Sequence, residues 1–182
     1  DLTERYRHLR LLQHAVQSSP GLPMPSYWKL VAESLYDAPD GQIRQAAQVV
    51  GSVFRDPILM QRSWAVVDDP AAKPAALRTA LQVLALDTAT DRLPRLLELL
   101  GQPALAPSVM TVLRRYQDLA VADRLLIGLH SGWEPRLSAL ALELLTSRPE
   151  WASALLDAVE AGRLPAGTVT AFHVRQMHGL GD

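Results

Sequence analysis

A helical phrase of eight residues recurs along this chain at a nearly constant interval, and it constrains the fold more than any other feature. Its copies share leading apolar residues at helical spacing, and they are LRLLQHAV at 9–16, IRQAAQVV at 43–50, LRTALQVL at 77–84 and LSALALEL at 137–144. Arg10, Arg44 and Arg78 are each 34 residues apart. A repeat of this length indicates stacked supersecondary units that bury their apolar faces against neighbouring units.

A second series of segments repeats between the copies of this phrase. Its members begin, in register, at Lys29, Arg62, Arg95, Arg124 and Ala154, with spacings of 33, 33, 29 and 30 residues. Two helices of about 12 residues with two short turns account for this period. We therefore predict that each unit is a helical hairpin.

Apolar residues fall at helical rather than alternating spacing, and no stretch is typical of a strand. The predicted helices are 3–17, 26–36, 41–54, 57–67, 74–86, 91–100, 106–116, 121–130, 135–146, 149–160 and 168–178. The first two are joined by a proline-rich connection at 20–25. Asp56 suits an N-cap before Pro57, and Pro94 suits a first turn. Ser147 and Glu150 have the spacing of a capping box.

The period also narrows the choice of repeat family. The signature residues of tetratricopeptide and ankyrin repeats are missing at the matching offsets. The phrase L-R-x-x-A, with proline opening a helix, resembles HEAT and armadillo repeats, although these units are shorter than the usual ~40 to 47 residues. We predict an all-α fold, a right-handed α-solenoid of about five HEAT-like hairpins in a single domain, 1–182. The predicted repeats are 1–38, 39–69, 70–101, 102–131 and 132–162, followed by a terminal helix in 163–182.

Composition excludes several classes of function. The net charge of −1 gives no global positive field for binding a phosphate backbone. The absence of cysteine excludes disulfides, thiolate metal sites and cysteine nucleophiles. No apolar run approaches the ~18 to 20 residues of a transmembrane helix. Because the sequence starts at Asp1, we expect it to be a processed or excised piece of a longer protein.

The C-terminal segment 151–182 carries a narrower resemblance. It resembles the end of the HEAT-like region in large exported proteins of planctomycetes and verrucomicrobia, in which sugar-dehydrogenase-like propeller and c-type cytochrome domains often flank the repeats. The matching residues are Leu155, Leu156, Ala158, Val159, Glu160, Gly162, Leu164, Pro165, Val169, Thr170, Ala171, Phe172, Arg175, Gln176 and Met177. This resemblance implies an exported or periplasmic location. The haem attachment motif of the cytochrome domains is missing here, so we expect no cofactor in this chain.

The strongest candidate binding site is a column of cations on the predicted second helices. Lys29, Arg62, Arg95 and Arg124 occupy equivalent positions, and guanidinium groups at repeat spacing could bind an acidic partner segment. The alternative is a solvated flank with local pairs, such as Lys29 with Glu33. For the arginines of the first helices, Arg10, Arg44 and Arg78, we expect structural contacts to turns.

The four tryptophans lie in or beside the second helices. We expect Trp28, Trp64 and Trp151 to pack in the core, since each fits an apolar stripe. Trp133 lies in a turn after Gly132 and is the best candidate for an exposed aromatic anchor.

Histidines and acidic pairs give weaker signals. His8 and His14 are six residues apart and His173 and His178 five, so neither pair has the spacing of a helical metal site. The acidic pairs are Asp68 with Asp69 and Glu33 with Asp37; they lack a partner nucleophile, and turn or capping roles are expected.

These observations favour a non-catalytic scaffold that binds another protein, or a flanking domain of the same chain, in its groove. Lys29, Arg62, Arg95, Arg124 and Trp133 are the predicted partner-binding residues. A HEAT-like enzyme of the DNA glycosylase type is the alternative, although the low charge argues against it. A spacer between flanking domains is a third possibility.

Overall fold

The computed structural model describes residues 2–18, 22–87 and 90–180, and part of the predicted connection at 20–25 lies outside them. The described residues form only helices and connections, so the predicted all-α class is confirmed. They divide into two compact units, Asp1–Asp87 and Thr88–Asp182. The boundary falls inside the third predicted repeat.

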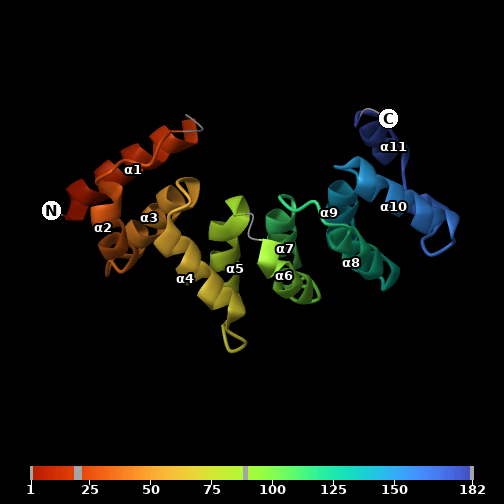
Figure 1. Ribbon diagram of the computed structural model, residues 1–182, viewed down its shortest axis with the longest axis horizontal. Helices are drawn as coiled ribbons and strands as arrows, with labels where there is room; N and C mark the ends of the chain where they lie inside the picture. Colours follow the sequence, from red (N-terminus) through yellow and green to blue (C-terminus); the bar gives the residue numbers. More distant parts are fainter. Residues whose placement is uncertain (1, 19–21, 88–89, 181–182) are drawn as a thin grey trace. The chain divides into compact units, whose positions relative to one another are not determined.

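The described residues of the first unit form five α-helices (Figure 1). They are α1 (Leu2–Ser18), α2 (Trp28–Tyr36), α3 (Gly41–Val53), α4 (Pro57–Asp68) and α5 (Pro74–Val83), and α5 continues as the short 3-10 helix η1 (Leu84–Leu86). Each of these helices begins and ends within a few residues of its predicted range. The reason is that apolar periodicity, together with proline or aspartate at the helix start, sets the helix bounds locally.

In the second unit, the part that the structure describes starts with the 3-10 helix η2 (Thr90–Arg92), and six α-helices follow (Figure 1). They are α6 (Leu93–Leu99), α7 (Ala106–Leu113), α8 (Leu119–His130), α9 (Pro135–Leu145), α10 (Pro149–Glu160) and α11 (Ala171–His178), with the 3-10 helix η3 (Ala166–Thr168) before α11.

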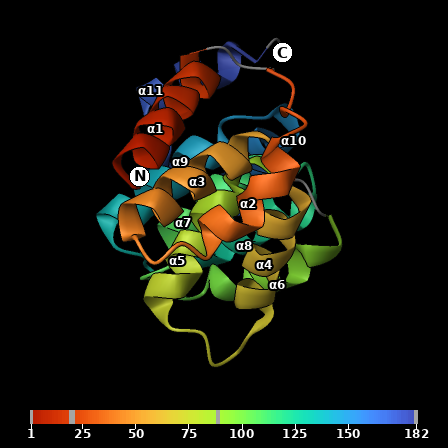
Figure 2. The ribbon, with the colours of Figure 1, turned by 90° about the vertical axis from the view of Figure 1, so that its left-hand side faces the viewer.

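Within each unit the helices follow one packing pattern. In the first unit, α3 packs against both α1 and α2, and α5 packs against both α3 and α4. Figure 2 shows α1 alongside α3. In the second unit, α9 packs against both α7 and α8. At α3, α5 and α9, the first helix of a pair therefore lies against both helices of the preceding pair.

Each unit has a core of aliphatic residues and tryptophan. Trp28 and Trp64 are 1% and 7% exposed in the first unit, and Trp151 is fully buried in the second, so the three predicted core tryptophans are confirmed. The small residues Ala46 and Ala47 on α3 permit close approach to α1 and α2. The largest buried side chains of the second unit are Leu96, Leu99, Leu100, Leu105, Leu113, Leu125, Leu137, Leu144 and Trp151.

The predicted helix starts are confirmed at two places and wrong at a third. Asp56 caps α4 by accepting from the amides of Ile58 and Leu59 at 3.0 and 3.2 Å, and Pro94 lies in the first turn of α6. The capping box at Ser147 does not form. Arg148 is the N-cap of α10, and the Ser147 hydroxyl donates to the Leu144 carbonyl at 2.6 Å instead.

Candidate functional site

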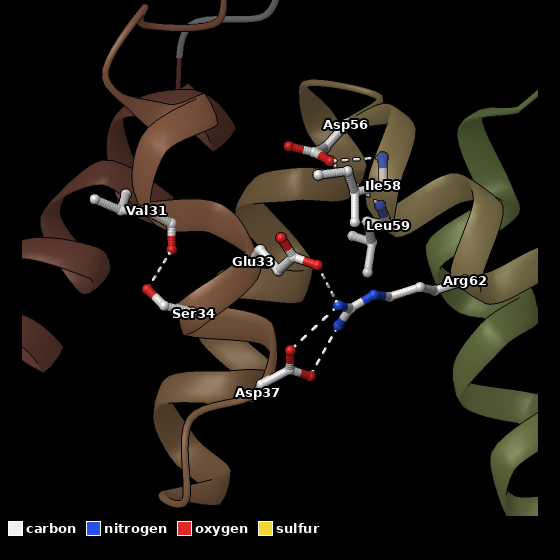
Figure 3. A network of polar contacts seen from close by, with 8 residues as sticks. All are labelled: Val31, Glu33, Ser34, Asp37, Asp56, Ile58, Leu59 and Arg62. Carbon is white, nitrogen blue, oxygen red and sulfur yellow. Dashed lines mark hydrogen bonds and ion pairs between the residues drawn. The ribbon is translucent and has the colours of Figure 1, made fainter.

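Arg62 on α4 binds two carboxylates of α2 and its C-cap (Figure 3). Its Nη1 donates to Asp37 Oδ1 at 2.8 Å, and its Nη2 donates to Glu33 Oε1 at 2.9 Å and to Asp37 Oδ2 at 3.2 Å. The pairing with Asp37 is bidentate, which matches the planar fork of a guanidinium. The two helices are consecutive second helices of the predicted repeats, so Arg62 links two neighbouring helix pairs within the first unit.

The network of Arg62, Glu33 and Asp37 carries more negative than positive charge. The hydrogen bonds and charges of Asp37 and Glu33 raise the pKa of the Arg62 guanidinium above its usual range. Two carboxylates nevertheless surround one cation. Lys29, on the same helix as Glu33, is exposed and makes no ion pair among the described residues. Glu33 pairs with Arg62 instead of with Lys29.

A second acidic group, Asp56, lies buried near this network and is already used by the fold. One of its carboxylate oxygens caps α4, and the other accepts from Trp28 Nε1 at 2.9 Å. Trp64 makes an analogous contact to Asp87 at 2.5 Å. In both contacts a tryptophan of a second helix binds an aspartate, which is the N-cap of α4 for Trp28 and the C-cap of η1 for Trp64. Sequence reasoning missed this role because the two residues of each pair are distant in the chain.

In the second unit, Arg95 and Arg124 also contact their own chain. Arg95 Nη1 pairs with Glu98 Oε2 at 2.9 Å, as predicted for a local pair. Arg124 on α8 donates from Nε to the Leu97 carbonyl at 3.2 Å, near the end of α6. A cation at this position satisfies a free carbonyl and interacts favourably with the helix dipole.

Among the arginines of the first helices, Arg44 makes the expected structural contact to a turn, although with a different acceptor. Arg44 donates to the carbonyls of Ala38 and Pro39 in the turn after α2, rather than to the neighbouring aspartates. Arg10 donates to Gln13 at 3.1 Å, and Arg78 is exposed.

Trp133 is half-buried, in contrast to the expected exposed anchor. Its indole lies against α8 so closely that a Cβ on Gly128 would come within 2.3 Å of the ring. Glycine at this position creates the space that the ring occupies. The positive φ of 81° at Gly132 forms the turn that brings Trp133 back onto α8.

An apolar groove, which sequence reasoning missed, lies between α8 and α10. It has a volume of about 440 Å³, and its lining residues are Asp123, Leu126, Ile127, His130, Ala158, Arg163 and Leu164. Ile127 is 56% exposed, and His130 Nδ1 donates to the Arg163 carbonyl at 2.8 Å. Ile127 was the residue that could have indicated this groove in the sequence, because it is apolar and lies outside the buried stripe of α8.

The remaining candidates are histidines and acidic residues. In the described part of the chain, no group of three or more histidine and carboxylate side chains could hold a metal ion. His173 accepts from the Thr170 amide at 3.2 Å and thereby closes a capping box at α11. Asp69 accepts from the Ala71 amide at 2.8 Å in a turn, as expected.

Comparisons with known proteins identify no relative. No protein-family model, curated protein or solved structure matches the chain. None of the described helices is long and apolar enough to cross a membrane.

Proposed function

We propose that this chain is a non-catalytic, HEAT-like scaffold that binds a protein segment on its second helices. The hairpins of such a scaffold stack as a right-handed α-solenoid. The packing of α3, α5 and α9 against both helices of the preceding pair supports this arrangement, because stacked repeats bury their faces in that way.

The groove between α8 and α10 carries this proposal. Leu126 and Leu164 provide a buried apolar floor at 6% and 4% exposure, whereas Ile127 projects into solvent. Asp123 and Arg163 place one charge of each sign on the lining. An apolar side chain of a partner would bury the exposed part of Ile127, and polar groups beside it would pair with the rim.

This location revises the role of the cation column. Arg62, Arg95 and Arg124 each contact acceptors of their own chain, so we assign them a structural role. Lys29 remains exposed and is retained as a partner-binding candidate in the first unit. Binding of DNA, the alternative function, draws no support from these arginines.

The test is selection of binding peptides from a displayed random library. We expect the full chain to select peptides with an apolar residue flanked by charges, and Ile127→Glu to weaken their binding at least about tenfold. Leu119→Glu is a matched control, since Leu119 is 53% exposed at the start of the same helix. Equal binding by both variants would exclude this groove, and failure to select any peptide would favour a spacer role.

We also propose that the scaffold belongs to a larger exported protein. The resemblance of 151–182 to the end of HEAT-like regions in such proteins supports this context. Sequencing of the complete reading frame tests it. A cytochrome domain with a haem attachment motif after residue 182 is expected, and a stop codon at that point would contradict the proposal.

A further inference from the structure

The charged residues of the first unit are divided unequally between its first and second helices. The second helices α2 and α4, with their C-caps, contain the acidic residues Glu33, Asp37, Asp68 and Asp69. The first helices α3 and α5 contain one arginine each and no acidic residue, and α1 contains three arginines and a single acidic residue. Because α3 contacts both α1 and α5, these three helices form a basic surface on the unit.

Two polar grooves flank α3 on this surface. The groove between α1 and α3 has a volume of about 200 Å³, and the groove between α3 and α5 has a volume of about 330 Å³. Gln45 and Val49 line both grooves, which therefore adjoin each other across α3. Among the described residues that line them there is no aspartate or glutamate, and glutamine is the commonest type. The glutamines are Gln13, Gln42, Gln45, Gln48 and Gln82.

Most of these carboxamides are available to a ligand. Gln13 accepts from Arg10 at 3.1 Å, whereas the side chains of the other four make no hydrogen bond within the described part of the chain. A carboxamide both donates and accepts hydrogen bonds. A polypeptide backbone also presents donors and acceptors, whereas the phosphates of a nucleic acid only accept. The glutamines therefore match an extended polypeptide backbone.

Arginines lie at both ends of the two grooves. Arg10 lines the groove beside α1 and is exposed. Arg78 is also exposed and makes no ion pair among the described residues. It is four residues from Gln82 and therefore lies on the same side of α5 as the second groove. Guanidinium groups in these positions match carboxylates of a ligand.

The surrounding charges favour a short acidic segment over a long polyanion. Glu4 on α1 and Asp40 at the N-cap of α3 are both exposed, and the whole chain has a net charge of −1. A nucleic acid extending past the grooves would meet this negative charge. A second copy of the chain is disfavoured as the occupant, because its Glu33 and Asp37 already bind Arg62.

We propose that the two polar grooves beside α3 bind an extended, acidic segment of a partner protein. The backbone of the segment pairs with the glutamine carboxamides, and its carboxylates pair with Arg10 and Arg78. Packed helices lie ~8 to 10 Å apart, so crossing from α1 to α5 takes roughly 16 to 20 Å. An extended strand covers that distance with about five or six residues.

The test measures the fluorescence anisotropy of a labelled peptide of about 12 residues in which aspartate alternates with threonine. We expect this peptide to bind the full chain saturably, and more weakly as salt is raised. Two probes serve as controls. A peptide with asparagine in place of aspartate should bind at least about tenfold more weakly, and a single-stranded DNA of equal charge should bind no better than that neutral peptide.

Two variants locate the binding. Arg78→Glu should weaken it at least about tenfold, and Gln45→Ala at least about threefold, because Gln45 lines both grooves. Arg136→Glu is the matched control: it makes the same charge change at an exposed position of a first helix in the second unit, and it should leave binding unchanged. Ile127→Glu should also leave it unchanged, so the proposed function and this proposal fail independently.

Several outcomes would overturn the proposal. They are absence of saturable binding of the acidic peptide, equal binding of the neutral peptide, and equal weakening by Arg136→Glu and Arg78→Glu. Tighter binding of the DNA would make the surface a nucleic-acid site instead. Self-association of the chain that Arg78→Glu abolishes would make a second copy the occupant.

Discussion

The Tyr36 hydroxyl is buried in the core of the first unit, and no hydrogen-bond partner is found for it among the described residues. Its ring packs edge to face on Trp28 with centroids 6.3 Å apart, and Tyr36 is 5% exposed. The aromatic body therefore contributes to packing, while its hydroxyl loses hydration without compensation. Two predictions at the scale of single residues follow from this position.

Gly51 on α3 faces the hydroxyl of Tyr36 on α2. A Cβ at position 51 would lie 2.1 Å from Tyr36 Oη and 2.9 Å from Leu59 Cδ2. Gly51→Ala should therefore lower the free energy of unfolding by about 1 to 3 kcal/mol in urea denaturation. Gly167→Ala is the control, since nothing lies within 4 Å of its new Cβ. Equal stability of the two variants would contradict the packing at Gly51.

Alkaline pH should destabilise the first unit through Tyr36. Burial, followed by the charge of Asp56, raises the pKa of Tyr36 above its usual value of 10.0. The folded state therefore holds this proton more tightly than the unfolded state. The associated stability is fully present below the unfolded pKa and is lost as pH rises above about 10.

The measurement is urea unfolding as a function of pH. Tyr36→Phe should remove the part of the alkaline loss that Tyr36 causes and should leave stability near neutral pH unchanged or higher. Tyr27→Phe is the control, because Tyr27 is largely exposed. An identical pH profile for wild type and Tyr36→Phe would show that Tyr36 is not responsible.

At the scale of helices, Asp40 and Asp56 are two N-caps that differ in burial. Asp40 caps α3 by accepting from the amides of Gln42 and Ile43 at 2.7 and 3.1 Å, and it is exposed. Asp56 makes the same kind of cap on α4 but is 2% exposed, and it also accepts from Trp28. Comparing substitutions at Asp40 and Asp56 therefore separates the stability that an N-cap contributes from the stability that a buried hydrogen bond between helices contributes.

We expect Asp40→Ala to lower the free energy of unfolding by about 1 kcal/mol. Asp56→Ala should lower it by about 2 to 4 kcal/mol, because it also leaves the buried Trp28 indole N–H without an acceptor. Chemical denaturation of both variants measures the difference. Similar losses for the two would show that the Trp28 contact adds nothing.

The link between α2 and α4 through Arg62 is predicted to be weak. The side chains of Arg62 and Asp37 are 40% and 63% exposed, so water screens their attraction. A double-mutant cycle of Arg62→Ala and Asp37→Ala should give a coupling of about 0.5 to 1 kcal/mol, reduced by salt. Lys29→Ala should change stability by less than about 0.5 kcal/mol. A coupling above about 2 kcal/mol would contradict this interpretation.

Local sequence patterns predicted the helices well because the relevant forces act within a few residues. Asp56 and Pro57 define the start of α4, as the side chain and ring act on adjacent backbone groups. The pattern failed at Ser147, where the chain is extended at Arg148 and α10 begins one residue later than a capping box requires. Arg148 stacks on Trp151 there, with its guanidinium 5.0 Å from the ring.

At the scale of the whole molecule, the chain contains two compact units rather than one set of uniform contacts. Each unit has its own buried core, with Trp28 in the first and Trp151 in the second. In repeat proteins, stability depends on each repeat and its nearest neighbours. We therefore expect a destabilising substitution in one unit to lower the stability of the other unit less.

Hydrogen exchange measured by mass spectrometry tests this expectation. Asp56→Ala should reduce amide protection more in 2–87 than in 90–180. Leu125→Ala, at a fully buried position of α8, should do the reverse. Equal loss of protection in both parts for each variant would show that 1–182 unfolds as a single cooperative domain.

The candidate sites show where sequence reasoning reached its limit. The register of Lys29, Arg62, Arg95 and Arg124 is visible in the sequence, but its chemical environment is not. Arg62 meets carboxylates 25 and 29 residues away, and Arg124 meets a carbonyl 27 residues away. Which cations remain available to a partner depends on these distant acceptors.

The sequence by itself determined the all-α class, the positions of most helices and the core roles of Trp28, Trp64 and Trp151, because periodicity and capping are local properties. Only the tertiary structure decided which polar groups are satisfied within the chain and which apolar residues remain exposed. Tyr27 and Val31 illustrate the reason: they are as apolar in type as the buried residues beside them, and burial is decided by whether another helix covers them.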